Sequence, residues 1–114
     1  MVSEQEKPDG NFPTLRVPNP EREDSFALAK KYARAVAADV IIATDPDSDR
    51  LGVAVLDDDG GYQMLSGNQI GLLLMEYILA TKSARGELSE KDYCITSVVS
   101  SNLARVIAER YNVK

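Results

Sequence analysis

Three aspartates at alternate positions, Asp45, Asp47 and Asp49, follow the apolar run at residues 40–44, and Arg50 comes directly after them. In an extended chain, residues two positions apart point to the same side, so we expect the three carboxylates to converge. At a separation of roughly 5 Å and an effective dielectric constant of about 20, each pair would repel by about 3 kcal/mol. Such a concentration of charge predicts a bound cation. The all-oxygen donor set favours a hard divalent ion, Mg²⁺ above all.

Two other uses of an acidic loop can be compared with this spacing. A calcium-binding EF-hand that starts at Asp45 requires Gly at the sixth position and Glu at the twelfth, but these positions hold Arg50 and Leu56, which excludes it. A haloacid-dehalogenase-like phosphatase would use Asp45 as its nucleophile in an Asp-x-Asp-x-Thr/Val motif, but Asp49 stands where Thr or Val belongs. That phosphatase and a free-standing acidic metal-binding module without chemistry remain the alternatives to an enzyme metal site.

The negative charge of the chain is concentrated around the same loop. The 114 residues carry a net charge of −5 with no histidine. Residues 43–60 contain six Asp and one Arg, which account for the whole −5, and the remainder balances at 12 acidic against 12 basic residues. We therefore expect no nucleic-acid partner, since no basic cluster exists. The absence of histidine removes the commonest general base and the usual zinc ligand.

The remaining composition predicts a protein of the cytoplasm without a membrane partner. The apolar runs are shorter than a bilayer span, and the first residues lack the basic, apolar and small-residue order of a leader. Cys94 is the single cysteine, so it cannot form an internal disulfide. We expect it to be a small buried side chain in a reducing compartment.

The first half of the chain predicts a helix and three strands. Residues 1–23 read as an extended connection with four prolines, and a helix is expected over about 24–38, capped by Asp24 or Ser25. The run 39–44 is predicted to be a central strand covered on both faces. Residues 51–56 and 62–65 read as a hairpin around an aspartate-glycine turn, with close backbone approach at Gly52.

The second half predicts a helix, a strand and a helix. Residues 66–82 carry apolar side chains around most of a helix, which predicts burial on most sides. Residues 93–99 read as a third apolar strand. Ser100 or Ser101 is expected to cap a last helix with one apolar side formed by Leu103, Val106, Ile107 and Tyr111. The alternation of helices and strands is typical of the α/β class, as a layered sheet with packed helices.

Four segments in this order resemble the α-D-phosphohexomutase superfamily, the phosphoglucomutase and phosphomannomutase enzymes. They span residues 8–71 and read Pro-Asp-Gly-Asn-Phe-Pro at 8–13, Pro-Asn-Pro-Glu at 18–21, Thr-Asp-Pro-Asp-Ser-Asp-Arg-Leu at 44–51 and Ser-Gly-Asn-Gln at 66–69. The acidic loop together with the Ser-Gly-Asn segment is most similar to the phosphoglucomutase and phosphopentomutase branch. Residues 93–111 resemble the start of the family's next domain more loosely.

The resemblance implies a phosphosugar mutase that interconverts hexose 1-phosphate and 6-phosphate, with glucose the expected sugar, through a phosphoserine and a bisphosphorylated sugar. It implies that Asp45, Asp47 and Asp49 hold Mg²⁺, and that Arg50 is a catalytic residue beside the transferring phosphate. It also implies a fragment of a multi-domain enzyme, with residues 1–65 in the metal-loop domain and 66–114 opening the next. The family's serine loop has no counterpart here, so we expect the chain to be inactive without the remaining mutase domains.

Overall fold

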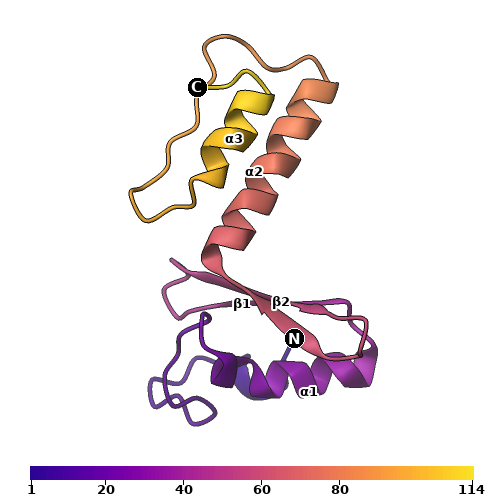
Figure 1. Ribbon diagram of the computed structural model, residues 1–114. Coiled ribbons are helices and arrows are strands. Elements are labelled where there is room, and N and C mark those ends of the chain that lie inside the picture. Colours follow the sequence, from indigo (N-terminus) through magenta and orange to yellow (C-terminus); the bar gives the residue numbers. More distant parts are fainter. The chain divides into compact units, whose positions relative to one another are not determined.

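The computed structural model describes all residues from Met1 to Lys114 and divides them into two compact units, Met1–Gly67 and Asn68–Lys114 (Figure 1). Helices and a sheet occur together, so the α/β class is confirmed. The chain has this order of elements: η1 (Ser3–Gln5), η2 (Glu23–Phe26), α1 (Ala27–Val36), β1 (Val40–Thr44), β2 (Leu51–Leu56), β3 (Tyr62–Leu65), α2 (Gly67–Ala84) and α3 (Leu103–Arg110). None of the helices combines the length and hydropathy that crossing a bilayer requires.

The first unit is a three-stranded antiparallel sheet in the order β1-β2-β3, with α1 lying across one face (Figure 1). Its core consists of small and aromatic side chains between sheet and helix: Phe26, Ala33, Ile41, Ala54 and Tyr62. The Tyr62 hydroxyl donates a hydrogen bond of 2.5 Å to the backbone oxygen of Ala38, which ties β3 to the end of the helix region.

The prediction that the run 39–44 is a central strand covered on both faces is wrong for this chain. β1 lies at the edge of the sheet, and β2 is the central strand. Ile41 faces the helix and is 7% exposed, whereas its neighbour Ile42 is 68% exposed on the other face. Because β2 alternates in the same way opposite β1, the uncovered face carries the paired side chains Val40 with Val55 and Ile42 with Val53. An apolar run shows that both faces favour burial, but it does not supply the covering layer.

Gly52 confirms the predicted close approach of backbone. A Cβ atom at this position would lie 2.1 Å from the carbonyl oxygen of Pro20 and 3.0 Å from Cε2 of Phe26. The proline-rich segment therefore packs directly on the middle of β2. Only a residue without a side chain permits that contact.

The connection between β2 and β3 is the expected aspartate-glycine turn. Asp57 Oδ1 accepts hydrogen bonds from the amides of Asp59 and Gly61, and the Asp57 amide donates to the Gly61 oxygen at 2.9 Å. Gly60 has φ +79°, a left-handed conformation that favours glycine. Asp57 therefore serves to close the hairpin.

The start of the first helix differs from the prediction. No side chain caps α1, and the chain enters it through the 3₁₀ turn η2. Asp24 pairs with Arg22 instead, and the Ser25 hydroxyl donates to the Val17 oxygen. The 3₁₀ turn places Phe26 fully inside the core. Val36 is exposed at the end of the helix.

The second unit contains α2, α3 and the chain between them. Leu79 of α2 packs with Ala108 and Val113, and Cys94 joins this cluster half-buried. The expected burial of the long helix on most sides is wrong, since Leu79 is its single buried residue. Four of its apolar residues are exposed: Leu73, Leu74, Tyr77 and Ile78. One short helix and an irregular segment cannot cover a stripe this wide.

The last helix is also shifted from its expected face. Ala104 and Ala108 are its buried residues, and Ile107 and Tyr111 border the cluster, whereas Leu103 and Val106 are about half exposed. Asn102 occupies the N-cap position without a side-chain cap bond. Ser101 still contributes, because its hydroxyl accepts a hydrogen bond from the Leu103 amide.

The predicted third strand at residues 93–99 is not formed. The segment is irregular, and Ser97 to Ser100 makes a turn in which the Ser100 amide donates to the Ser97 oxygen at 3.0 Å. A strand requires a neighbour that accepts and donates along its backbone. The sheet of the first unit consists of β1, β2 and β3 alone. Residues 93–99 are therefore apolar but belong to no sheet.

Candidate metal centre

The acidic loop is the six-residue connection of the β1–β2 hairpin. Thr44 pairs with Leu51 at the hairpin base, which leaves residues 45–50 to reverse the chain. The alternation of aspartates predicted an extended loop, and this prediction is wrong. The Ser48 amide donates to the backbone oxygen of Asp45 at 3.0 Å, and Ser48 has φ +58°. A turn, not a continued strand, therefore determines where the carboxylates lie.

Asp45 is the anchored member of the cluster. It is 4% exposed, the only charged residue among the buried ones. Its Oδ1 accepts a hydrogen bond from the Arg50 amide at 3.1 Å, and its Oδ2 accepts one from Arg50 Nε at 2.7 Å. Burial of a carboxylate is tolerated when both oxygens are paired in this way.

The turn brings the three carboxylates together despite the failure of the extended-chain argument. One oxygen from each of Asp45, Asp47 and Asp49 lies within 4.8 Å of the other two. Oxygen ligands at about 2.1 Å from one Mg²⁺ lie at most about 4.2 Å apart. The three oxygens therefore have to move closer together to hold such an ion. The exposure of Asp47 and Asp49 leaves them free to make that movement. The residues present therefore fit a hard divalent cation.

The charges of the loop influence one another strongly. Burial opposes ionisation of Asp45, but the hydrogen bonds from the Arg50 side chain and amide outweigh it and lower its pKa to about 2. The pKa of Asp49 is raised, first by its hydrogen bond with Asp45 and then by the charges of Asp47 and Asp45. Arg50 Nε also lies 3.5 Å from Asp49 Oδ1, and its pKa is raised chiefly by the bond to Asp45. Three carboxylates and one guanidinium leave a formal charge of −2.

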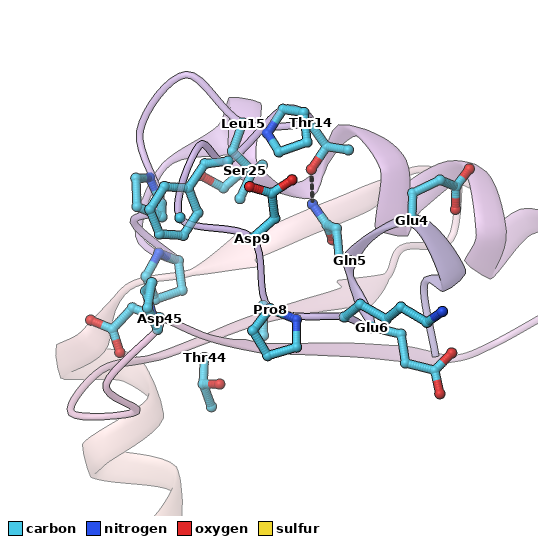
Figure 2. A pocket seen from close by; sticks show the side chains of 18 of the residues that line it. Glu4, Gln5, Glu6, Pro8, Asp9, Thr14, Leu15, Ser25, Thr44 and Asp45 are labelled. Atoms are coloured by element: carbon cyan, nitrogen blue, oxygen red, sulfur yellow. Dashed lines mark hydrogen bonds between the residues drawn. The ribbon is translucent and has the colours of Figure 1, made fainter.

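A cavity of about 460 Å³ opens beside Asp45 in the first unit (Figure 2). The N-terminal segment forms most of its wall, and Thr44, Asp45 and Pro46 close one side. The Gln5 side chain donates to the Thr14 hydroxyl at 3.1 Å across this wall, as the dashed line in Figure 2 marks. Residues 1–23 were expected to form an extended connection, and no cavity was predicted beside them. The prolines were the available signal that this segment holds a defined shape.

The fold and the loop together define an α/β protein with a candidate divalent-metal site in a hairpin. The chain belongs to the phosphoglucomutase/phosphomannomutase family, because the family model described as "Phosphoglucomutase/phosphomannomutase, alpha/beta/alpha domain II" matches residues 1–60. The resemblance to the phosphohexomutase superfamily that the four sequence segments indicated is therefore confirmed.

Similar curated proteins include mutases from several bacteria. A protein named phosphoglucomutase from Staphylococcus saprophyticus is 44% identical over 114 residues, which is all of this chain and 20% of that protein. A phosphoglucomutase from Staphylococcus aureus is 43% identical over 115 residues and is likewise covered to 20%. A probable phosphomannomutase from Haemophilus influenzae is 40% identical over 112 residues, which is 98% of this chain and 22% of that protein. The chain thus spans about a fifth of their length. No solved structure matches it.

Proposed function

We propose that this chain is the part of a phosphosugar mutase that carries its metal loop. The parent enzyme would interconvert hexose 1-phosphate and 6-phosphate, with glucose as the sugar, through a phosphoserine and a bisphosphorylated intermediate. The observation that supports this most is the meeting of three carboxylates within 4.8 Å, inside the segment that the family model matches. Residues 1–65 would then belong to the metal-loop domain and residues 66–114 to the next one.

Asp45, Asp47 and Asp49 are the proposed Mg²⁺ ligands. The formal charge of −2 on the loop is matched by one divalent ion, and carboxylate oxygens suit Mg²⁺ better than they suit softer metals. When bound, the ion would neutralise charge on a transferring phosphoryl group. Asp45 provides the fixed ligand because Arg50 orients both of its oxygens. Asp47 and Asp49 provide exposed ligands that adjust.

Arg50 is proposed to act in catalysis beside the transferring phosphate. Its Nε is engaged by Asp45, and its side chain is 44% exposed at the loop surface. A planar guanidinium held by one edge can present its remaining donors to a phosphate in a fixed orientation. Phosphoryl transfer depends mainly on such positioning and charge stabilisation, so the loop needs no histidine.

The phosphoryl-donating serine and the sugar-binding residues are proposed to lie in other domains of the parent enzyme, in the cytoplasm. The purified 114-residue chain is therefore expected to show no mutase turnover with glucose 1-phosphate. Turnover above the level of a mock purification would overturn this part of the proposal.

Metal titration tests the ligand assignment directly. We would titrate the chain with Mn²⁺, followed by its electron paramagnetic resonance signal, and repeat the titration with Mg²⁺ as competitor. Asp47→Asn and Asp49→Asn are each expected to weaken Mn²⁺ binding by roughly tenfold or more, because each removes one ligand and one charge. Asp58→Asn is the matched control, since it removes the same charge from the β2–β3 turn.

The result expected of the control is binding within about twofold of the unchanged chain, because Asp58 contributes only a long-range, screened charge. Equal losses in all three variants would show that the loop attracts cations only by its net charge. That result would contradict a defined site.

A further inference from the structure

Two exposed Asp-Gly pairs occur in the first unit, Asp9-Gly10 and Asp59-Gly60, and their surroundings differ. In such a pair the amide nitrogen of glycine can attack the carboxyl carbon of the preceding aspartate, because glycine has no side chain to hinder the approach. The Gly60 amide is engaged, since it donates to the Asp57 oxygen at 3.1 Å inside the β2–β3 turn. The Gly10 amide donates to no atom of the chain, and nothing lies within 4 Å of a Cβ added to Gly10.

The turn that contains Asp9 and Gly10 activates both reacting groups. Oδ1 of Asp9 accepts hydrogen bonds from the Asn11 backbone amide at 2.9 Å and from Asn11 Nδ2 at 3.1 Å. Donors on this oxygen stabilise the negative charge that it gains when the carboxyl carbon is attacked. The Phe12 amide donates to the backbone oxygen of Asp9 at 3.1 Å. That oxygen belongs to the same peptide group as the Gly10 nitrogen, so this bond stabilises the charge left when the nitrogen loses its proton.

The Asp59-Gly60 pair has none of these activating contacts. The carboxylate and the backbone oxygen of Asp59 accept no hydrogen bond from the chain. The turn is also held on both sides by the pairing of β2 with β3, so the rotation that brings the two reacting groups together requires local opening of the hairpin. The second pair is therefore a control within the same molecule.

We propose that Asp9 is a site of spontaneous isoaspartate formation. The Gly10 nitrogen forms a bond to Cγ of Asp9, the Cγ–Oδ2 bond breaks, and Oδ2 leaves as water with the amide proton and the carboxyl proton. Water then opens the cyclic imide. Breakage of the bond between the nitrogen and the backbone carbonyl carbon gives isoaspartate, whereas breakage at Cγ restores aspartate. Water is the only other reactant, and the inference does not depend on the metal site.

The product would change the wall of the cavity beside the metal loop. Asp9, Gly10 and Phe12 line that cavity, and Figure 2 shows Asp9 among the lining side chains. Isoaspartate adds one carbon atom to the main chain between residues 9 and 10. The oxygen that accepts the hydrogen bond from the Phe12 amide then becomes part of a free carboxylate. We therefore expect the turn to change its shape while the sheet stays intact.

Heavy oxygen taken up from water measures each passage through the imide, because hydrolysis adds one oxygen atom whichever product forms. The 114-residue chain is incubated in mildly acidic water enriched in that isotope, since only a protonated carboxyl group loses water readily. Synthetic peptides of residues 5–13 and 55–63 are incubated in parallel. Trypsin digestion in ordinary water and fragment masses then separate label at Asp9 from label at Asn11, and an isoaspartate peptide elutes apart from its aspartate form.

The folded chain is expected to have opposite effects on the two pairs. Labelling at Asp9 is expected to be about threefold or more faster in the chain than in its peptide, because the hydrogen bonds of the turn stabilise the transition state. Labelling at Asp59 is expected to be about tenfold or more slower in the chain than in its peptide, because the hairpin must open first. The ring resonances of Tyr62 report that the first unit stays folded during the incubation.

Two variants test the atoms involved. Gly10→Ala hinders the attacking nitrogen and is expected to remove most of the labelling at Asp9. Asn11→Ala removes one of the two donors to Oδ1 and is expected to slow that labelling by about two- to tenfold. The proposal is overturned if Asp9 is labelled no faster in the chain than in its peptide, if Asp59 matches Asp9 in the chain, or if either variant leaves the rate at Asp9 unchanged.

Discussion

Arg50 holds Asp45 by two bonds, one from its backbone amide to Oδ1 and one from its side-chain Nε to Oδ2. The carboxylate is buried, so its charge has little access to water. The same arginine therefore orients a proposed metal ligand and compensates its charge. This relationship makes the stability of the hairpin depend on a residue that is also proposed to act in catalysis.

Replacement of Arg50 by alanine is expected to destabilise the first unit. The variant removes the guanidinium that pairs with a buried carboxylate, and a buried charge that has lost its counter-charge is costly. We expect the melting temperature, followed by the ring resonances of Tyr62, to fall by roughly 5 °C or more. Arg22→Ala is the control, because it breaks an exposed ion pair with Asp24 that contributes little to stability. A similar small shift in both variants would show that Asp45 is solvated.

Replacement of Gly52 by alanine is expected to destabilise the same unit by overpacking. The added Cβ would lie 2.1 Å from a backbone oxygen of Pro20, so strand and segment must separate. The expected loss is about 1–3 kcal/mol in the free energy of unfolding, measured by urea titration. Gly10→Ala is the matched control, since nothing lies within 4 Å of its added Cβ. An unchanged midpoint for Gly52→Ala would mean that the proline-rich segment does not pack on β2.

Two adjacent isoleucines in β1 are expected to respond oppositely to lysine. Ile41→Lys places a charge in the core and is expected to unfold the first unit, whereas Ile42→Lys is expected to change the unfolding free energy by about 0.5 kcal/mol or less. The circular dichroism spectrum and the urea midpoint distinguish these results. Equal destabilisation by both would show that the second face of the sheet is covered in solution.

The hydroxyl of Tyr111 is expected to keep its proton to unusually high pH. It donates to Glu76 Oε1 at 2.6 Å, and this bond to a carboxylate, followed by burial, raises the pKa of Tyr111. A group whose pKa is raised in the folded state stabilises it below the unfolded value of 10.0. That contribution is lost as the pH rises through the higher folded value.

Spectrophotometric titration of the phenols near 295 nm measures this effect. Tyr111→Phe is expected to remove the last component of the titration and to make the stability of the second unit less dependent on pH above about 10. Tyr93→Phe, which removes an exposed phenol, is the control. If Tyr93→Phe removed the last component instead, the late titration would belong to Tyr93, which would contradict this prediction.

The residue pattern alone was sufficient for the features that depend on local chemistry. The hairpin turn at Asp57, the missing side chain at Gly52 and the gathering of charge at residues 45–50 follow from residue types at short spacing, because turns and close approaches are determined within a few residues. The family was also evident from the order of the motifs, and the match to residues 1–60 confirms it.

Tertiary structure decided which apolar surfaces are covered and how the acidic side chains meet. Ile42 and Ile95 have the same apolar character as Ile41, but burial requires a neighbouring layer that periodicity cannot specify. The carboxylates converge because the chain turns at Ser48 and Arg50 donates a hydrogen bond to Asp45, not because the strand continues. Local preference determines what a side chain favours, whereas the free energy of burial depends on contacts between residues far apart in the chain.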